Sequence, residues 1–247
     1  MLTKVAKNFT TFWRMPHISV NLMLHATATN DPFFALVVRD FYANVRRRHR
    51  KLPLIRAMEF GVALCRLPIS FDEHFRAIEA AARRNYKKAA REGCTFRRIE
   101  FNDHLEAIRE IRQSSEFRQG KKMPEAYLQE QVAPCLDPPS RNPIHDYPFF
   151  GVFIGDKLVA YASCMIAGEL ALLAHILGHA DYLEQGAVPF LLIELIRYLQ
   201  QTHPQVRYYV YGTYFGATES MQRFKWKFNF LPHRVFWELG EQASGAR

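Results

Sequence analysis

The alternation of hydrophobic and polar residues in the second half of the chain predicts a strand meander. Residues 149–178, FFGVFIGDKLVAYASCMIAGELALLAHILG, contain three runs rich in β-forming residues, separated by the turn pairs Gly155-Asp156 and Gly168-Glu169. Glycine turns between such runs are typical of antiparallel hairpins. We therefore predict a three-stranded antiparallel meander in this stretch.

Helical periods flank the meander. Ser70, with Glu73 completing a capping box and Gly93 as a stop, predicts one helix over residues 70–93. Asn102 predicts the start of another helix. The remaining expected elements are strands at 61–69, 94–101, 206–215 and 233–239, and helices at 102–117, 124–132 and 191–201.

Residues 223–230, RFKWKFNF, fit two periods. As a strand, they place basic residues on one face and aromatic residues on the other, which suits a nucleic-acid platform. As the end of a helix, Met221, Phe224 and Phe228 form one apolar stripe and the charges form its solvent side. The pattern alone leaves both interpretations open.

Composition indicates a packed globular protein with a basic surface. The chain has 247 residues, 49% of them hydrophobic, and a formal net charge of +9. We expect one domain at 61–247, preceded by a basic, helix-leaning N-terminal appendage at 1–60. A polyanionic partner is expected: nucleic acid, anionic lipid, a phosphate-bearing cofactor or an acidic carrier protein. The run Arg46 to Lys51 is either an anion-binding patch or a solvated helix end.

The four cysteines stand far apart, without a C-x-x-C pair, so we expect reduced thiols rather than a zinc site or a disulfide scaffold. We also expect a cytoplasmic protein, because the basic N-terminus followed by ISVNLML is too short and too interrupted for a secretion signal. No stretch approaches the roughly 20 apolar residues of a spanning helix. Peripheral contact with a membrane stays open.

The order of elements from Cys94 to Leu239 resembles the GNAT acyltransferase superfamily. The preceding stretch ARRNYKKAAREG is similar to the Fem-type, BioF-like branch, which includes aminoacyl-tRNA-dependent transferases. The resemblance implies an α/β (α+β) fold with a mixed, largely antiparallel sheet flanked by helices. It also implies that residues 223–230 end a helix, with Phe224 and Phe228 in the core and Arg223, Lys225 and Lys227 available to solvent or phosphate.

In typical members of that superfamily a glycine-rich loop before a helix binds the pyrophosphate of the acyl carrier. LEQGAVPF occupies this place here, but Val188 stands where a second small residue belongs and Pro189 removes a donor. The resemblance therefore implies a less conventional donor site, for which the candidate residues are Gln185, Gly186, Ala187, Arg223 and Lys225.

The candidate catalytic residues are Glu169, His175 and Tyr214. Glu169 and His175 lie on the strand where the superfamily places its general base, and His179 is a further candidate there. Tyr214 could substitute for the superfamily's tyrosine acid, whose position is Lys225 here. His175 and His179 are roughly 13 Å apart on a regular strand, too far to share a metal, so we expect no metal site.

The loop SSEFRQGKKMP supplies Arg118, Gln119 and Lys121 as candidate acceptor-binding residues, which suit a carboxylate or phosphate, or else form a solvated turn. We expect an acyltransferase that acylates an amine or hydroxyl, with acyl-CoA or acyl carrier protein as co-substrate and no permanently bound cofactor. The alternatives are an aminoacyl-tRNA-dependent transferase, with Arg83, Arg84, Lys87 and Lys88 on the phosphates, and a non-catalytic anion-binding module. The acceptor is not predicted.

Overall fold

The computed structural model describes residues 15–49, 53–118, 121–129, 131–136, 138, 140 and 142–240. Its strands are β1 (His17–Asn21), β2 (Val62–Arg66), β3 (Cys94–Ile99), β4 (Phe117–Arg118), β5 (Lys121–Lys122), β6 (His145–Asp146), β7 (Phe149–Ile154), β8 (Lys157–Ala167), β9 (Leu170–Gly178), β10 (Tyr208–Thr213) and β11 (Leu231–Glu238). The α-helices are α2 (Arg39–Arg46), α3 (Phe71–Ala77), α4 (Ala80–Arg91), α5 (Leu105–Gln113), α6 (Glu125–Leu128), α7 (Ala187–Thr202) and α8 (Glu219–Lys227). Shorter helical turns are η1 (Ala26–Asn30), η2 (Phe34–Val38), η3 (Phe101–His104) and η4 (Ala180–Tyr182).

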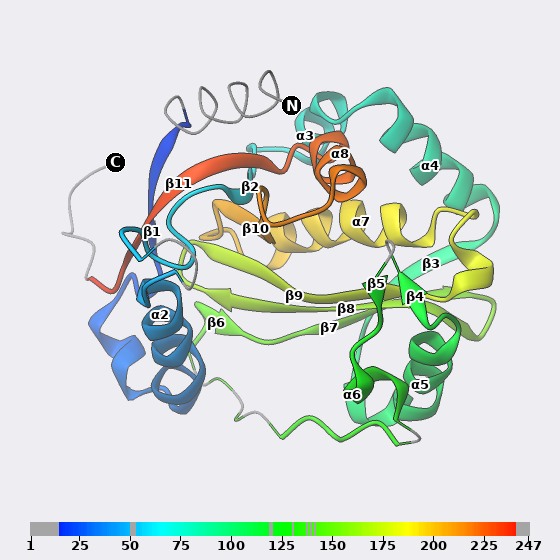
Figure 1. Ribbon diagram of the computed structural model, residues 1–247, viewed down its shortest axis with the longest axis horizontal. Coiled ribbons are helices and arrows are strands. Elements are labelled where there is room, and N and C mark those ends of the chain that lie inside the picture. Colours follow the sequence, from blue (N-terminus) through cyan, green and yellow to red (C-terminus); the bar gives the residue numbers. More distant parts are fainter. Residues whose placement is uncertain are drawn as a thin grey trace.

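One sheet carries the fold, in the order β1-β11-β2-β10-β9-β8-β7-β3, with β6 paired to β8 (Figure 1). The predicted meander β7–β8–β9 lies within it, and Gly155 and Gly168 make its turns at φ 58° and 55°. β1 with β11 and β9 with β10 are parallel pairs, whereas the other neighbours are antiparallel. The predicted mixed, largely antiparallel α/β fold is confirmed.

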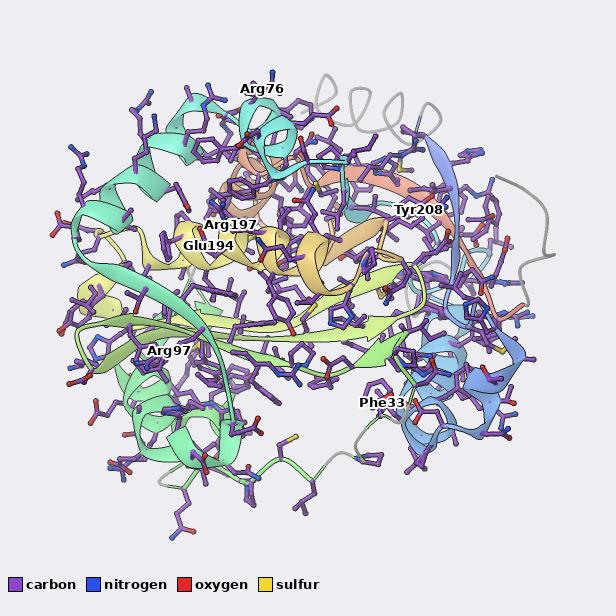
Figure 2. All side chains as sticks on the ribbon, turned by 180° about the vertical axis from the view of Figure 1, so that it is seen from behind. Phe33, Arg76, Arg97, Glu194, Arg197 and Tyr208 are labelled. Atoms are coloured by element: carbon purple, nitrogen blue, oxygen red, sulfur yellow. The ribbon has the colours of Figure 1, made fainter. Side chains whose placement is uncertain are left out.

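Helices cover both faces of the sheet. The apolar helix α7 packs on one face together with α3, α4 and α8, and the second face is covered by α5 at one end and by α2 at the other (Figure 1). α7 is buried along most of its length because it carries apolar residues on nearly every side. A half-buried polar group joins it to α4: Arg197 donates to Tyr86 Oη at 3.2 Å and pairs with Glu194 at 3.2 Å (Figure 2).

The described residues before 61 continue the same sheet. β1 pairs with β11, and Asn21 at its end is tied to the turn between β8 and β9: its N–H donates to Glu169 Oε2 at 3.0 Å, and its carbonyl accepts from Glu169 N at 2.9 Å. Val20 and Leu22 are fully buried in the core beneath α2. The boundary at residue 60 stays a prediction, but residues 17–46 cover part of the core and include a strand that the helix-leaning interpretation did not anticipate.

Residues 70–93 form two helices instead of the single predicted helix. Ser70 does cap the first, since its Oγ accepts from Glu73 N at 3.2 Å. The chain then becomes extended at Ile78, which is 2% exposed, and the N–H of Glu79 donates to the carbonyl of Lys227 at 3.0 Å. Burial of Ile78 and this contact with α8 outweigh the helical propensity of the segment.

The ambiguous stretch 223–230 ends a helix, as the resemblance implied. α8 ends at Lys227, Phe228 is 2% exposed, and Asn229 adopts a left-handed φ of 63°. Asparagine tolerates this region better than most residues, which explains how it ends the helix where the superfamily has glycine.

The described cysteines are free: Cys65, Cys94 and Cys164 are buried, and Cys135 is partly buried. Within the described ranges, the helices are all too short or too polar to cross a lipid bilayer.

Gly168→Ala tests whether the contact between β1 and the meander is part of the core. A Cβ at this position would lie 2.3 Å from the carbonyl oxygen of Asn21, whereas a Cβ at Gly155, in the neighbouring turn, would meet nothing within 4 Å. Both substitutions force alanine into a left-handed conformation, which costs about 1–2 kcal/mol. Overpacking costs about a further 1–3 kcal/mol at Gly168 alone. Gly168→Ala is therefore expected to lower the free energy of unfolding by about 1–3 kcal/mol more than Gly155→Ala does, as measured by urea denaturation. Equal losses would contradict the packing described here.

Candidate functional site

β9 and β10 are paired over three residues and then part. Their parallel register runs from Leu170 with Tyr208 to Leu172 with Val210. β9 carries one extra residue, Ala174, against β8, and β10 shifts register against β2 at Gly212, whose φ is 58°. Bulges bend a strand and increase its twist. Continuing the register would place Ala174 opposite Gly212, so both irregularities fall at the same point along the two strands. The strands part there, and the backbone groups beyond Leu172 and Val210 are no longer paired between β9 and β10.

Lys225 lies on the β10 side of this opening. It is 5% exposed, its Nζ donates to the carbonyl of Thr213 at 2.8 Å, and the ammonium lies 4.7 Å from the ring centroid of Tyr211. Burial lowers the pKa of Lys225 from 10.5 to about 8. The expectation that Lys225 stays available to solvent was wrong, because α8 turns this side chain inward onto the end of β10.

His175 lies on β9, on the face covered by α5 and α6. Its Nδ1 is 2.7 Å from the phenol oxygen of Tyr127 in α6. Arg112 lies 4.7 Å from the centre of the Tyr127 ring, and its Nε donates to Tyr161 Oη at 2.9 Å. Burial, with a further contribution from the charge of Arg112, lowers the pKa of His175 below its usual 6.5. The ring keeps an exposed edge, so a neutral imidazole is accessible at pH 7.

Sequence reasoning missed Tyr127 and Arg112. Tyr127 stands in a four-residue helix behind Pro124, and Arg112 stands on the polar side of α5. Their types and spacing do not distinguish them from ordinary surface residues. Only the tertiary packing of α5 and α6 over β9 brings Arg112 and Tyr127 close to His175.

Arg118, a predicted acceptor-binding residue, ties the segment after α5 to the end of β9. Its guanidinium donates to the carbonyls of Gly178 at 2.8 Å and Ile111 at 2.9 Å, and burial lowers its pKa. Ser114 Oγ accepts from Ala180 N at 2.9 Å and so strengthens the same link. Gln119 lies outside the described residues, and only the backbone of Lys121, in β5, is described.

The predicted donor-binding loop does stand at the N-terminus of α7. Gly186 caps the helix with a φ of 85°, and a Cβ there would lie 2.7 Å from the carbonyl oxygen of Asn85 in α4. Ala187 is fully buried, and the amide of Gln185 faces the carbonyls of nearby η4. Lys88 Nζ donates to the carbonyl of Glu184 at 2.8 Å. α4 therefore covers one side of the loop and brings basic residues beside it.

The other predicted donor-binding and catalytic residues are dispersed. Arg223 forms a bidentate ion pair with Glu79, the residue before α4. Glu79 lies about 9 Å along the helix axis from Asn85, which contacts the loop at Gly186. Tyr214 follows β10, its N–H donates to the carbonyl of Gly61 at 2.6 Å, and burial raises its phenol pKa.

Glu169 lies just before β9, and His175 lies six positions further along the chain, roughly 20 Å on a regular strand. The carboxylate is 8% exposed and accepts from Asn21 N at 3.0 Å, with Arg207 Nε at 3.6 Å from its other oxygen. The structure therefore does not bring the two predicted bases together.

Comparison with known proteins bears on the fold. No protein-family model matches the chain, and no curated protein matches it in sequence. The crystal structure of FemX is similar with a TM-score of 0.52 and 10% sequence identity, over 70% of this chain and 59% of that one. The C-terminal domain of a putative lysylphosphatidylglycerol synthetase from Agrobacterium fabrum gives a TM-score of 0.45 and 16% identity, over 70% and 57% of the two chains.

A third similar structure is the ribosomal-protein-S18-alanine N-acetyltransferase from Escherichia coli, with a TM-score of 0.31 and 23% identity over 44% of this chain and 60% of that one. The chain spans less than two thirds of the length of each of these structures. The likeness to FemX concerns the fold, and the predicted resemblance is confirmed at that level: the chain has a GNAT-like fold of the Fem type.

The buried ammonium of Lys225 makes stability depend on pH. With a pKa of about 8 in the folded state against 10.5 as the ordinary value, the unfolded chain binds more protons between these pH values. The free energy of unfolding of the wild type is therefore expected to rise relative to Lys225→Met from about pH 8 to 10.5, with a slope approaching about 1.4 kcal/mol per pH unit. Urea denaturation at several pH values measures this. Lys227→Met, on the same helix, serves as the control, and an identical pH profile for both variants would contradict the burial of Lys225.

Proposed function

We propose that the protein is an acyltransferase that moves an acyl group from an activated donor, acyl-CoA or an acyl carrier protein, to an amine or hydroxyl of an acceptor. The observation that carries the proposal is the opening between β9 and β10, with the accessible, neutral His175 on one of its strands. Free backbone N–H groups on the edge of β9 are suited to polarise an acyl carbonyl, and His175 is suited to take a proton.

In the proposed reaction Nδ1–H of His175 donates to the phenol oxygen of Tyr127, which leaves Nε2 as the base. The acceptor nitrogen attacks the acyl carbonyl and gives its proton to Nε2. The new C–N bond forms, the C–S bond to the carrier arm breaks, and the imidazolium returns the proton to the departing thiolate. Because the pKa of His175 lies below 6.5, the ring needs no prior deprotonation at pH 7.

We assign a structural role to Glu169. Its carboxylate accepts the backbone N–H of Asn21, and its own N–H and carbonyl bond neighbouring strands. A carboxylate held in this way by a backbone N–H and by Arg207 stabilises the junction of β1, β9 and β10. It lies too far from the opening to take a proton there.

The charge of α4 supports a polyanionic donor. Arg84, Lys87, Lys88 and Arg91 are exposed on a helix that contacts the loop at Gly186. Arg83 is used internally, since it donates to the carbonyl of Arg76 at 2.9 Å at the end of α3. The phosphates of CoA or of a carrier arm fit this surface. An aminoacyl-tRNA donor is the second candidate, favoured by the same exposed helix, and a module that binds anions without turnover is the third.

Donor binding separates these candidates. We expect acyl-CoA at 100 times its dissociation constant to stabilise the protein by about 2.7 kcal/mol, a rise in Tm of roughly 5 to 10 °C in a thermal-shift assay. Free CoA and a polyanion such as heparin serve as controls. A shift with the polyanion but none with any acyl-CoA would contradict an acyl-CoA donor and favour a carrier protein, tRNA or anion binding alone.

Base assignment rests on a comparison of two substitutions. His175→Gln is expected to lower acyl transfer by about 10²- to 10⁴-fold, and Tyr127→Phe by about tenfold, because a single hydrogen bond to the base is lost. kcat/KM of the wild type should rise with pH through a value below 6.5. Release of free thiol from acyl-CoA with a panel of amines measures transfer. Glu169→Gln should lower stability with transfer retained; the reverse pattern, with His175→Gln fully active, would overturn the assignment.

A further inference from the structure

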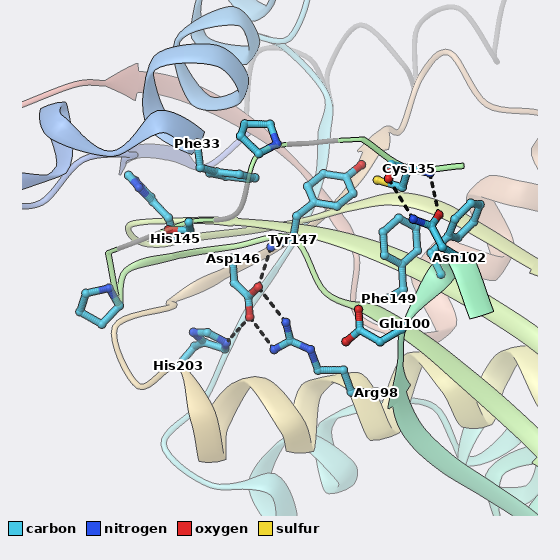
Figure 3. A pocket seen from close by; sticks show the side chains of 14 residues that line it. Phe33, Arg98, Glu100, Asn102, Cys135, His145, Asp146, Tyr147, Phe149 and His203 are labelled. Carbon is cyan, nitrogen blue, oxygen red and sulfur yellow. Dashed lines mark hydrogen bonds and ion pairs between the residues drawn. The ribbon is translucent and has the colours of Figure 1, made fainter. Parts of the chain in front are cut away.

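A cavity of about 520 Å³ lies where β3 and β6 end, beside the C-terminal end of α7. Phe33, which immediately precedes η2, and the ends of the sheet strands contribute to its walls (Figure 3). Pro138 and Ser140 also line it. The proposed acyl transfer does not use it. Its walls combine aromatic rings with charged and polar side chains.

Four neighbouring rings line the cavity, and we call them the aromatic wall: Phe33, Tyr147, Phe149 and Phe101. Tyr147 and Phe149 are partly exposed, whereas Phe33 and Phe101 are buried. Phe33 and Tyr147 have centroids 6.2 Å apart, Tyr147 and Phe149 5.7 Å, and Phe149 and Phe101 4.6 Å. The four rings are tilted against one another, with interplanar angles of 52°, 57° and 41°. Each aromatic face carries partial negative charge, so the wall favours a cation over an anion.

The charged groups leave one carboxylate unmatched. Asp146 and Arg98 form a two-bond ion pair at 2.8 and 3.1 Å, and Asp146 also lies 3.7 Å from His203 Nε2. Glu100 lines the same cavity, is exposed, and has no ion pair or side-chain hydrogen bond to any residue in the part of the chain that the structure describes. In the view of Figure 3 its carboxylate lies below the Phe149 ring, on the side of Arg98.

A second acid, Asp31, contacts two residues of the cavity wall. It is buried, bonded to His145 Nδ1 at 2.8 Å, and accepts from Ser140 Oγ at 2.7 Å. His145 and Ser140 both line the cavity. In a chain with a formal net charge of +9, the described lining of this cavity therefore carries the exposed carboxylate of Glu100 beside its one arginine–aspartate pair.

We propose that this cavity binds an organic cation, an ammonium group carried on an apolar body. Tyr147 and Phe149, the partly exposed rings of the aromatic wall, receive the cation and its methyl or methylene groups, and Glu100 supplies the opposite charge at the rim. An anion would meet the carboxylate of Glu100 and the negative ring faces, while the guanidinium of Arg98 is already occupied by Asp146. A neutral apolar ligand would desolvate Glu100 without compensation.

Calorimetric titration of the full chain with choline tests the proposal, because choline has an uncharged carbon analogue of the same shape, 3,3-dimethylbutan-1-ol. Choline is expected to bind at least about tenfold more tightly than the analogue, and sodium acetate is expected not to compete. Equal binding of choline and the analogue, competition by acetate, or no detectable heat with choline at millimolar concentration would each overturn cation recognition.

Glu100→Gln locates the site. It is expected to raise the dissociation constant of choline by about 5- to 30-fold, and Glu100→Lys by more. Because Glu100 is exposed and without a bonded partner in the described chain, these variants should fold as the wild type does, which circular dichroism checks. Glu92→Gln, an exposed glutamate at the end of α4, is the matched control. An unchanged dissociation constant in Glu100→Gln would remove the cavity as the cation site, whatever the outcome of the acyl-transfer assays.

Discussion

The parting of β9 and β10 is the constraint on which the rest of the candidate site depends. Parallel strands normally continue their ladder, and breaking it leaves backbone groups without partners. Here the break is built into the covalent chain, by the extra residue Ala174 in β9 and by the left-handed Gly212 in β10. A side chain at Gly212 would strain the backbone, so the opening is tied to that residue type.

Two contacts hold the parted strands in place. Lys225 donates to the carbonyl of Thr213, the last residue of β10. Arg118 donates to the carbonyl of Gly178, the last residue of β9. Both are cations with hydrogen bonds to backbone oxygen in partly desolvated places, and burial lowers the pKa of each. Because both side chains donate to backbone carbonyls, neither is free to bind a phosphate.

The fold could be predicted further than the site. Periodicity and glycine turns located the meander, the apolar α7 and the last two strands, because these features depend on local pattern. The break at Ile78 escaped prediction, since it depends on a contact with Lys227 far along the chain. β1 escaped for the same reason: HISVN is short, and its strand partner β11 comes more than 200 residues later. Long-range pairing leaves little local signal.

Among the candidate residues, the position of His175 on its strand places the side chain on the face that α5 and α6 cover. Tyr127 of α6 therefore lies within hydrogen-bond distance of His175. Glu169 was chosen for its place at the start of the same strand, but a strand is long compared with a hydrogen bond, and strand membership alone does not bring two residues together. Charge was misleading for Lys225, where an amphipathic pattern placed it outside and the packing of α8 turned it inward.

The sheet also separates two kinds of chemistry in the proposed reaction. On the α7 side, α4 offers exposed arginines and lysines next to a helix N-terminus, and these attract phosphate by charge and by the helix dipole. On the α5 side, His175 and Tyr127 offer a neutral base and a phenol. A carrier arm entering between β9 and β10 would have its anionic end on the first side and its acyl carbon near the second. The phosphates of the donor would thereby lie away from the base, where their negative charge would otherwise favour the protonated imidazole. Arg112 acts in the opposite direction, because its positive charge favours the neutral ring of His175. The separation therefore preserves a base that is ready at neutral pH.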